Sequence, residues 1–506
     1  MRPIFWHGTE RKRTGNGSLR GERLSEQPSL KKNIAISTVY QVLLIILPLI
    51  TAPYVARVLG PDQSGIYDYT NSIQTYFAMF AALGTASYGA REISRVRNDV
   101  EMRSKLFWEI ELMTVMTSAA CIAVWFAFIA FTSQYKVIYL VLTMGLISTM
   151  FDISWFFTGM EQFKYTVSKN AACKLAGVVL MFMFVKKQED LLLYIFIITA
   201  STMLGNMSMW LYIPRFITKV DFRTLRFRNH FHETLIYFVP SIATSVYTVL
   251  DRTLIGVITK NKAENGCYHY TMQIINMMKA LTFSSLNMVL GSRIAFLFAE
   301  GRYDEIKTRI KDSINYILFM GIGICFGLIG VSKRFVPVFL GPGYDRVVTM
   351  LMLMSPIVII IGVSNCLGSQ YYTPSGNRKL SAKFIIIGAL VNLILNLILI
   401  PRYWGYGAIV ASLIAEMVIT ILYFKYCNGY LTAQTVIKEG WKKLAAGIVM
   451  LALIKLIDRF VSSNVIALLA EVAAGFAVYC AVVMLLRDSF ITDIVFGKIL
   501  KRKGRA

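Results

Sequence analysis

Fourteen long apolar runs limit what this chain can fold into more than any other feature. A bilayer core of about 30 Å is crossed by about 20 helical residues, because each residue of an α-helix rises 1.5 Å. Membrane barrels are excluded, since their strands have about ten residues with strict alternation. The predicted spans are residues 35–56, 66–88, 106–131, 136–158, 166–185, 191–214, 235–259, 268–298, 313–331, 347–373, 384–400, 404–424, 444–458 and 464–486. The sequence therefore predicts an all-α membrane protein with about 14 transmembrane helices.

The apolar runs belong to a duplicated pattern. The segment Gly65-Ile66-Tyr67-Asp68-Tyr69-Thr70 matches Gly266-Cys267-Tyr268-His269-Tyr270-Thr271 at an offset of 201 residues, and Gly89-Ala90-Arg91 matches Gly291-Ser292-Arg293 at 202. Six spans separate the copies, and an even number returns the chain to the same side of the membrane. The two halves should therefore run parallel, related by an axis along the membrane normal, with a substrate site at the seam between them. We predict two parallel six-helix lobes plus two extra C-terminal helices.

The spans and the polar segments between them divide the chain into six predicted parts. These are a basic tail at 1–33, an N-lobe at 34–214, a cytoplasmic linker at 215–234, a C-lobe at 235–427, a two-helix appendage at 428–486 and a second basic tail at 487–506. Residues 1–33 lack the apolar core of a cleavable signal peptide. We expect this tail to be disordered and cytoplasmic.

The distribution of Lys and Arg predicts the orientation of the helices. Segments assigned alternately to the inside, starting with residues 1–33, carry 37 of the 53 basic residues, and segments assigned to the outside carry 11. Cytoplasmic segments of membrane proteins show such an excess of basic residues. Both termini are therefore predicted to be cytoplasmic, in agreement with an even number of spans.

Several classes of function are disfavoured. The net charge of +24 does not indicate nucleic-acid binding, because the basic residues lie in short tracts between apolar runs. The seven cysteines form no CxxC pair and the four histidines have no ligand spacing, so we expect no metal. Outside connections reach only about 15 residues, too short for the loops of a membrane polymerase, and no Walker loop is present. We therefore expect that the protein is not an enzyme and has no catalytic residues and no bound cofactor. Gradient-driven transport is the class of function that remains.

Ionisable residues at membrane depth are the candidates for function, because each costs roughly 2.5–3.5 kcal/mol on insertion scales. Counted from the span ends, Lys174, Lys279 and Glu416 lie near the midplane, Asp152, Arg91 and Arg293 in the inner third, and Arg57, Asp251 and Arg252 towards the outer face. The alternative is that the arginines are anchors that reach the membrane surfaces and that Asp251 only neutralises its neighbour.

Two lysines and two asparagines stand out within the spans. Lys279 and Lys174 occur in one repeat only, because alanine occupies the equivalent positions 78 and 389. A cation present in one lobe is hard to explain as scaffold, so we expect Lys279 to face a central cavity; a buried ion-pair role is the alternative. Asn392 and Asn396 share one helix face and could hydrogen-bond a sugar or another helix, of which helix packing is favoured.

Several stretches in combination resemble a known family. They are Pro53-Tyr54-Val55-Ala56-Arg57-Val58-Leu59-Gly60, Tyr88-Gly89-Ala90-Arg91-Glu92-Ile93, Asp152-Ile153-Ser154-Trp155-Phe156-Phe157-Thr158-Gly159, Asp251-Arg252, and Asn392-Leu393-Ile394-Leu395-Asn396 ahead of Ile400-Pro401. Within residues 35–427 the chain is similar to the lipid-linked oligosaccharide flippases of bacterial polysaccharide biosynthesis. Their superfamily also contains the multidrug and toxin extrusion transporters.

The resemblance implies two lobes around a V-shaped cavity that opens alternately to each side of the bacterial inner membrane. The implied substrate is an undecaprenyl-diphosphate-linked repeat unit, flipped to the outer leaflet, and the implied partners are bilayer lipids and polysaccharide polymerase or assembly proteins. A diphosphate needs a wet, positively charged path. The best residues for its capture are Arg91, Arg293 and Lys279, with Arg57, Arg252 and Lys174 as further candidates. In an unbroken α-helix Lys279 and Arg293, 14 residues apart, lie on one face about 21 Å apart.

Coupling to H⁺ or Na⁺, if transport uses it, requires an acidic residue at depth without a fixed cationic partner. Glu416 and Asp152 are the first candidates, and Asp251 is third because Arg252 is adjacent. Two other functions stay open. One is a cation-coupled multidrug or small-molecule exporter of the same superfamily, which a positive cavity argues against. The other is a non-transporting membrane scaffold of a capsule assembly complex.

Overall fold

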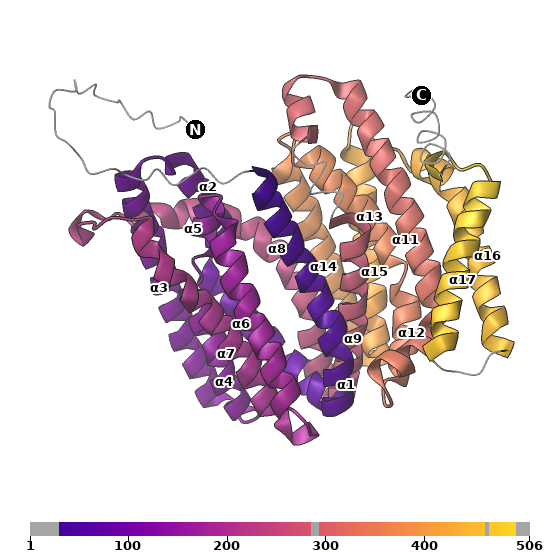
Figure 1. The fold of residues 1–506 in the computed structure, drawn as a ribbon, viewed down its shortest axis with the longest axis horizontal. Helices are drawn as coiled ribbons and strands as arrows, with labels where there is room; N and C mark the ends of the chain where they lie inside the picture. Colours follow the sequence, from indigo (N-terminus) through magenta and orange to yellow (C-terminus); the bar gives the residue numbers. More distant parts are fainter. Residues whose placement is uncertain (1–29, 285–292, 461–464, 492–506) are drawn as a thin grey trace.

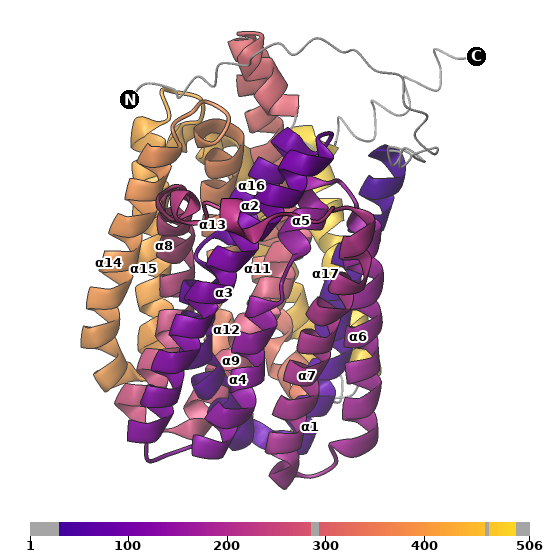
Figure 2. The ribbon, with the colours of Figure 1, turned by 90° about the vertical axis from the view of Figure 1, so that its left-hand side faces the viewer.

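The protein is represented by a computed structural model, and the structure describes residues 30–284, 293–460 and 465–491. Every regular element within these residues is a helix, and the long helices lie side by side in one bundle (Figure 1). The prediction of an all-α membrane protein is confirmed. Most of both basic tails lies outside the described residues. Viewed from the side, the long helices of the first half run along the height of the bundle, and its short helices lie near one end (Figure 2).

The first half of the chain forms seven α-helices. They are α1 (Leu30–Ala82), α2 (Thr85–Val96), α3 (Val100–Phe131), α4 (Lys136–Met150), α5 (Ser154–Gly159), α6 (Phe163–Phe184) and α7 (Leu191–Met209). Two predicted spans lie within α1, because Gly60 breaks the helix with φ 73° and Pro61 follows it. Glycine adopts a positive φ without strain, and proline fits the first turn of the next helix.

The second half contains the remaining helices. They are α8 (Arg228–Thr259), α9 (Lys262–Lys279), α11 (Tyr303–Leu340), α12 (Asp345–Met354), α13 (Ile357–Leu367), α14 (Arg378–Tyr403), α15 (Gly405–Tyr426), α16 (Ala433–Phe460) and α17 (Val465–Leu485). Two π-helical turns continue α9 and α13: η4 (Ala280–Ser284) and η5 (Gly368–Tyr372). The axes of α12 and α13 differ by 41° at a break that contains Pro356, as expected where proline interrupts a helix.

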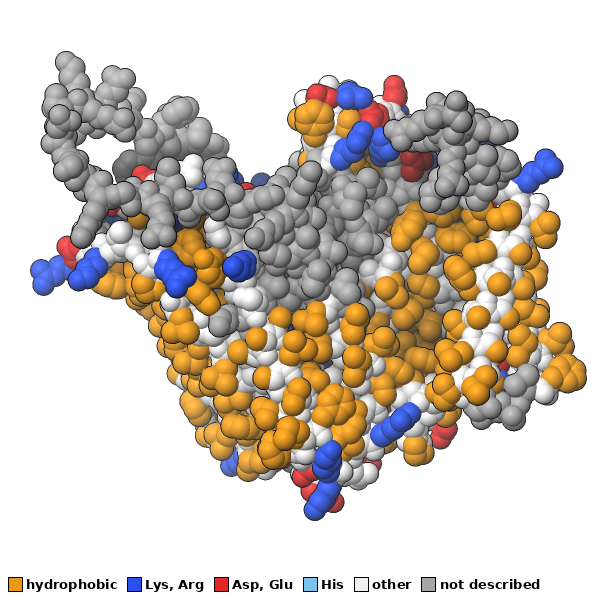
Figure 3. All heavy atoms as spheres, viewed as in Figure 1, with side chains coloured by type: hydrophobic (Ala, Val, Ile, Leu, Met, Phe, Trp, Pro, Cys, Tyr) orange, Lys and Arg blue, Asp and Glu red, His pale blue; other side chains and the backbone are white. Residues whose placement is uncertain are grey.

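The described residues of all fourteen predicted spans are largely helical, and residues 285–292 of the eighth and residue 464 of the fourteenth lie outside the described part. By length and hydropathy, eight of the described helices can cross a membrane, or nine when the bent α12–α13 pair counts as one. Hydrophobic side chains cover the middle of the face in Figure 3, and most charged ones lie at its two ends. The chain is a multi-pass membrane protein. The number of fourteen crossings and the six predicted parts stay predictions.

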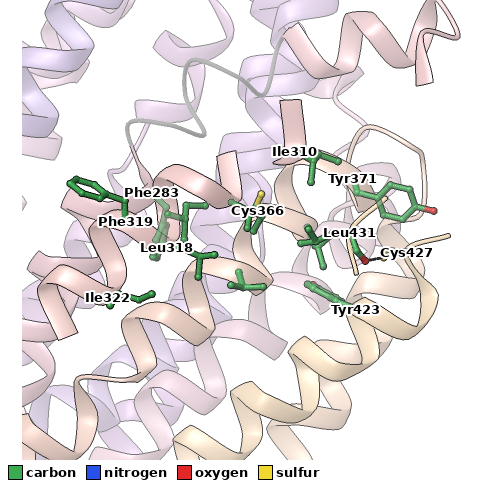
Figure 4. Close-up of a cluster of buried hydrophobic side chains, with 14 of the residues drawn as sticks. Phe283, Ile310, Leu318, Phe319, Ile322, Cys366, Tyr371, Tyr423, Cys427 and Leu431 are labelled. Atoms are coloured by element: carbon green, nitrogen blue, oxygen red, sulfur yellow. Dashed lines mark hydrogen bonds between the residues drawn. The ribbon is translucent and has the colours of Figure 1, made fainter. Parts of the chain in front are cut away.

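The largest hydrophobic cluster among the described residues lies in the second half of the chain. It combines side chains of η4, α11, α13, η5 and α15. Figure 4 shows Phe283 of η4, Leu318 of α11, Cys366 of α13 and Tyr423 of α15 gathered in this cluster. Because the cluster includes Phe283, it holds the π-helical turn that follows Lys279 in a defined place.

The appendage α16–α17 is attached to α11 by buried ion pairs. Arg334 of α11, with a side chain 3% exposed, lies 3.0 Å from Glu471 of α17 and 2.8 Å from Asp458 of α16. Near the other end of these helices, Lys443 of α16 lies 2.9 Å from Asp488. Charges buried in this way are costly unless paired, so these contacts fix how the appendage sits on the bundle.

Candidate functional site

The duplicated segment meets its own copy at the centre of the molecule. A Cβ atom on Gly65 of α1 would lie 1.8 Å from the carbonyl oxygen of Lys262, and one on Gly266 of α9 would lie 2.1 Å from that of Pro61. Both glycines and both carbonyl-bearing residues are related by the 201-residue offset. The contact is therefore reciprocal, like the interface of a two-fold dimer. We call this contact between the second half of α1 and α9 the seam.

Three charged or titratable side chains meet at the seam. Asp68 of α1 is 1% exposed, and its Oδ1 lies 2.7 Å from Nδ1 of His269 in α9 and 3.3 Å from a guanidinium nitrogen of Arg252 in α8. A carboxylate only accepts hydrogen bonds, so the imidazole N–H and the guanidinium donate. Asp68 comes from the first repeat and both donors from the second. The cluster therefore links the two halves of the chain.

A cavity of about 290 Å³ opens beside this cluster. It is lined by Pro48, Arg252, His269, Gln273, Asn276, Met277 and Ala280. The side chains of Arg252 and His269 are 23% and 19% exposed, whereas Asp68 does not line the cavity. The cavity therefore presents a guanidinium, an imidazole and two amides, a set of donors suited to an anionic group that carries several oxygens.

A second polar network lies behind the cavity. Asp251 of α8 is buried and accepts hydrogen bonds of 2.6 Å from each of Tyr268, Asn396 and Ser412. Asn396 also donates to Asn392 of the same helix at 3.0 Å. The two asparagines lie on one face of α14, as their spacing predicts, and bond to α8 and α15, which agrees with the helix-packing alternative.

Asp251 and Arg252 are adjacent but have different partners. None of the ion pairs among the described residues includes Asp251, whereas Arg252 pairs with Asp68 across the seam. Arg57 and Arg252 also differ, because Arg57 donates to the carbonyl oxygen of Val338 at the end of α11. Arg57 therefore contacts the other half of the chain at the end predicted to face outside.

Lys279 ends α9 one residue before the π-helical turn and is absent from the residues that line the seam cavity. Its neighbours Met277 and Ala280 line that cavity. The charge that acts on Lys279 is that of Glu416 in α15. Glu416 in turn lines a separate polar cavity of about 330 Å³ with Ser369 and Tyr423, among others. An electrostatic interaction with Glu416 is compatible with both alternatives for Lys279, and both stay predictions.

Arg91 and Arg293 lie near the end of the bundle predicted to be cytoplasmic. Their side chains are 52% and 58% exposed, and each lies near a glutamate, Glu92 at 3.9 Å and Glu305 at 3.7 Å. Whether they face one mouth across the seam stays a prediction. The common helix face predicted for Lys279 and Arg293 assumes an unbroken α-helix, and the π-helical turn η4 changes the rotation per residue between them.

Asp152 and Lys174 lie in the first half, away from the seam. Asp152 stands in the break between α4 and α5, where its Oδ1 accepts the backbone N–H of Ser154 at 2.9 Å. Lys174 is half-buried in α6. Asp152 thus makes a local turn contact, with Ile153 in the N-cap position of α5, and a role of Asp152 or Lys174 in transport stays a prediction.

Sequence reasoning did not select four titratable residues, of which Asp68 and His269 lie in the candidate site and Glu109 and Glu111 lie outside it. Asp68 and His269 were used only to detect the repeat, although their shared place in it could have indicated contact across a two-fold axis. Glu109 and Glu111 of α3 lie in a predicted span. Glu109 lies 2.9 Å from His230. Glu111 is buried, and neither of its oxygens has a hydrogen-bond partner among the described residues.

Comparison with known proteins gives both a family and a fold. The family described as "Polysaccharide biosynthesis protein" matches residues 30–291, just over half of the chain. A protein of Escherichia coli (strain K12) named "Putative O-antigen transporter" is 23% identical over 399 residues, which cover 78% of this chain and 95% of that protein.

Two solved structures have a similar fold. The structure titled "Lipid II flippase MurJ, inward closed conformation" superposes with a TM-score of 0.72 at 17% identity, over 90% of this chain and 99% of that one. The MATE multidrug transporter DinF-BH superposes with a TM-score of 0.55 at 14% identity, over 82% of this chain and 99% of that one. At such identities the likeness concerns the fold alone.

Proposed function

Because the chain belongs to the polysaccharide biosynthesis protein family, we propose that it is a flippase for lipid-linked oligosaccharides. It moves undecaprenyl-diphosphate-linked repeat units from the cytoplasmic to the outer leaflet of the bacterial inner membrane by alternating access. The relative named as a putative O-antigen transporter, matched over 95% of its length, supports this substrate class.

The observation that carries the proposal is the seam cavity with Arg252 and His269 on its wall. A diphosphate cannot cross hydrocarbon unpaired, because the desolvation of a free charge costs far more than a transporter can recover elsewhere. A guanidinium holds phosphate oxygens through two parallel hydrogen bonds. The amides of Gln273 and Asn276 complete a wall that donates hydrogen bonds. The diphosphate therefore binds at the seam, between the two halves that must part on each side in turn.

The lipid chain of the substrate has a separate place. An apolar groove of about 330 Å³ lies between α9, α11, α16 and α17, and Ile274, Met278, Phe476 and Tyr479 are among its lining residues. Figure 3 shows a hollow with hydrophobic side chains on this side of the bundle, next to the appendage. Ile274 and Met278 lie about 100° around α9 from Gln273 and Met277 of the seam cavity. One helix thus separates the polar headgroup from an apolar groove that suits a polyprenyl chain.

Ion coupling is assigned to Asp251, which now ranks above Glu416 and Asp152. Asp251 accepts hydrogen bonds from three neutral donors, whereas Asp152 accepts a local backbone N–H and Glu416 interacts electrostatically with Lys279. The side-chain oxygen of Asn396 beside Asp251 is buried without a hydrogen-bond partner among the described residues. A carboxylate and a free amide oxygen together can take up a proton or a small cation such as Na⁺.

The test is transport of a defined substrate in liposomes. The purified protein is reconstituted with a fluorescent undecaprenyl-diphosphate oligosaccharide, and the fraction that becomes accessible on the opposite leaflet is measured over time. The proposal predicts movement that depends on the protein and is lost in Arg252→Gln. Arg459→Gln, which changes an exposed-end arginine of α16, is the matched control. Absence of movement by the native protein, with a folded sample, would contradict the proposal.

The similarity in fold to the multidrug transporter gives one competing function, a small-molecule exporter. The cations at the seam argue against it, since a cationic drug would be repelled there. A deletion strain separates the two functions. Accumulation of lipid-linked repeat units on the inner leaflet supports the flippase, whereas drug sensitivity without accumulation supports the exporter. A strain that loses polysaccharide although the purified protein moves no lipid would indicate a scaffold.

A further inference from the structure

The bonds of Asp68 at the seam are incomplete in a way that leaves room for another anion. Both donors, Arg252 and His269, use the same oxygen, Oδ1. The other oxygen, Oδ2, and the Nε atom of Arg252 are buried without a partner among the described residues. Arg252 is thus held by a single contact of 3.3 Å, instead of the two parallel hydrogen bonds that an arginine makes with a well-placed carboxylate or phosphate.

The two donors can be reached from the cavity and the acceptor cannot. Arg252 and His269 line the seam cavity, whereas Asp68 is 1% exposed and absent from its wall. An anion that enters the cavity therefore approaches the same two donors from the side opposite Asp68. A diphosphate offers more oxygens and more charge than one carboxylate, so it competes for both donors.

We infer that the carboxylate of Asp68 acts as an internal substitute for the substrate's phosphate. Its bonds to Arg252 and His269 hold the seam closed until a diphosphate binds these two donors instead. This inference rests on the proposed function. Asp68 belongs to the first repeat and its donors to the second, so loss of these bonds removes polar links between the halves. Neutral hydrogen bonds also cross the seam, between Ser64 and Tyr270 at 3.3 Å and between Ser72 and Thr253 at 2.8 Å, so the bonds of Asp68 are its charged part.

The direction of the resulting movement follows from where the cluster lies. Asp68 is three residues beyond Gly65, close to the break at Gly60 that is predicted to face outside. Binding of the diphosphate from the cytoplasmic side would therefore loosen the outer end of the seam. A ligand shifts a conformational equilibrium only through its different affinities for the two states, and competition with Asp68 supplies that difference.

Binding experiments distinguish an internal substitute from a residue that merely positions Arg252. The full-length protein in nanodiscs is titrated with undecaprenyl diphosphate, with inorganic pyrophosphate and with undecaprenol, which has no phosphate. If Asp68 competes with the ligand, Asp68→Asn binds undecaprenyl diphosphate more tightly, by about fivefold or more, the lower range of coupling between two sites. If Asp68 positions Arg252, Asp68→Asn binds more weakly. Asp62→Asn, an exposed acid on the same helix, should leave affinity unchanged.

Tighter binding of pyrophosphate as well as the lipid indicates recognition of the phosphate groups themselves. Tighter binding of the lipid alone indicates that the diphosphate headgroup binds only when it carries its polyprenyl chain. Both outcomes support the inference, whereas undecaprenol binding that rises in Asp68→Asn overturns it. If the native protein binds no diphosphate lipid, the proposed function and this inference both fall; if it binds and Asp68→Asn binds more weakly, this inference alone falls.

The position of the seam is measured in parallel. Spin labels at Gln134 of the first half and Lys260 of the second, which line one surface hollow of about 610 Å³, report the separation of the outer ends in a background without native cysteines. We expect the distance to lengthen on addition of undecaprenyl diphosphate and to be long without ligand in Asp68→Asn. Asp68→Ser serves if the asparagine variant folds poorly. A short distance in a folded variant without ligand overturns the inference.

Discussion

Asp68 and His269 occupy the same place in the two repeats, 201 residues apart, and lie 2.7 Å from each other. Residues close to a two-fold axis contact their own equivalents, so identical residues here would place two like groups in contact. The repeats instead carry an acid in one copy and an imidazole in the other. The two equivalent positions therefore carry complementary side chains. Their hydrogen bond links the halves because the two copies of the repeat differ at this position.

Substitution of the seam glycines should destabilise the protein. A Cβ atom on Gly65 or Gly266 would overlap a backbone carbonyl of the other repeat, at 1.8 and 2.1 Å. We expect Gly65→Ala and Gly266→Ala each to lower the free energy of unfolding by about 1–3 kcal/mol, the usual cost of overpacking. The check is thermal unfolding in detergent. Gly327→Ala in α11, where the nearest atom lies at 3.9 Å, is the control. Equal melting temperatures for all three variants would show that the seam is not packed as described.

Reporter fusions test the predicted orientation. The 37-to-11 distribution of basic residues predicts that the linker before α8 is cytoplasmic and that the connection between α11 and α12 is external. A fusion near residue 220 should therefore read as cytoplasmic and one near residue 340 as external. The opposite pattern would invert the direction of transport proposed above.

The helices could be predicted from the sequence because they depend on local hydropathy. Each apolar run is long enough to cross the bilayer, and Gly60 with Pro61 marks the break inside α1. Among the described residues, fewer helices are long and apolar enough to cross a membrane, and the seam helices that carry the polar Asp68 and His269 are not among them. Those same residues form the site.

The candidate site could be predicted only in part. Arg252 and Asp251 were identified as charges at depth, but their partners depend on which helix face each one occupies. Adjacent residues on a helix point about 100° apart, so Asp251 bonds to α14 and α15 while Arg252 reaches α1. The sequence gives no direct sign of these tertiary contacts. The π-helical turn after Lys279 was likewise not predicted, and it invalidates a count of 100° per residue across it.

The ion pairs of Arg334 should be needed for the appendage to stay folded on α11. Removal of this guanidinium leaves Glu471, 1% exposed, as a buried charge. We expect Arg334→Ala to lower the free energy of unfolding by about 3–5 kcal/mol. Lys333→Ala is the matched control, because Lys333 is 78% exposed and 4.0 Å from Asp458. Thermal unfolding measures both. An Arg334→Leu/Glu471→Leu double variant should recover most of the loss, since Asp458, the other partner of Arg334, is 33% exposed and lies 4.0 Å from Lys333.

Asp251→Asn should uncouple transport from the ion gradient. The amide cannot take up a proton or a cation as the carboxylate does. Its NH₂ group would face Asn396 if it replaces Oδ1, or Tyr268 and Ser412 if it replaces Oδ2. We expect substrate movement in liposomes that no longer responds to an imposed H⁺ or Na⁺ gradient, together with a loss of about 1–3 kcal/mol of stability for each donor left unpaired. Full response to the gradient by a folded Asp251→Asn protein, with loss of response in Glu416→Gln, would transfer the coupling role to Glu416.

Variants of Lys279 and Glu416 test whether the cation of Lys279 at membrane depth binds the substrate or pairs with another residue. If Lys279 captures the diphosphate, Lys279→Ala abolishes flipping although the protein is present at normal abundance, and Lys279→Arg retains part of the flipping activity. Removal of Glu416 from the Lys279→Ala protein then does not restore flipping. If Lys279 is the partner of Glu416, Lys279→Ala removes the partner of a buried carboxylate and lowers abundance, and Lys279→Ala/Glu416→Ala recovers it. We expect the second pattern, because Lys279 is absent from the wall of the seam cavity. Additive losses of abundance in the double variant would contradict the pairing, and normal abundance without flipping in Lys279→Ala would return Lys279 to the substrate path.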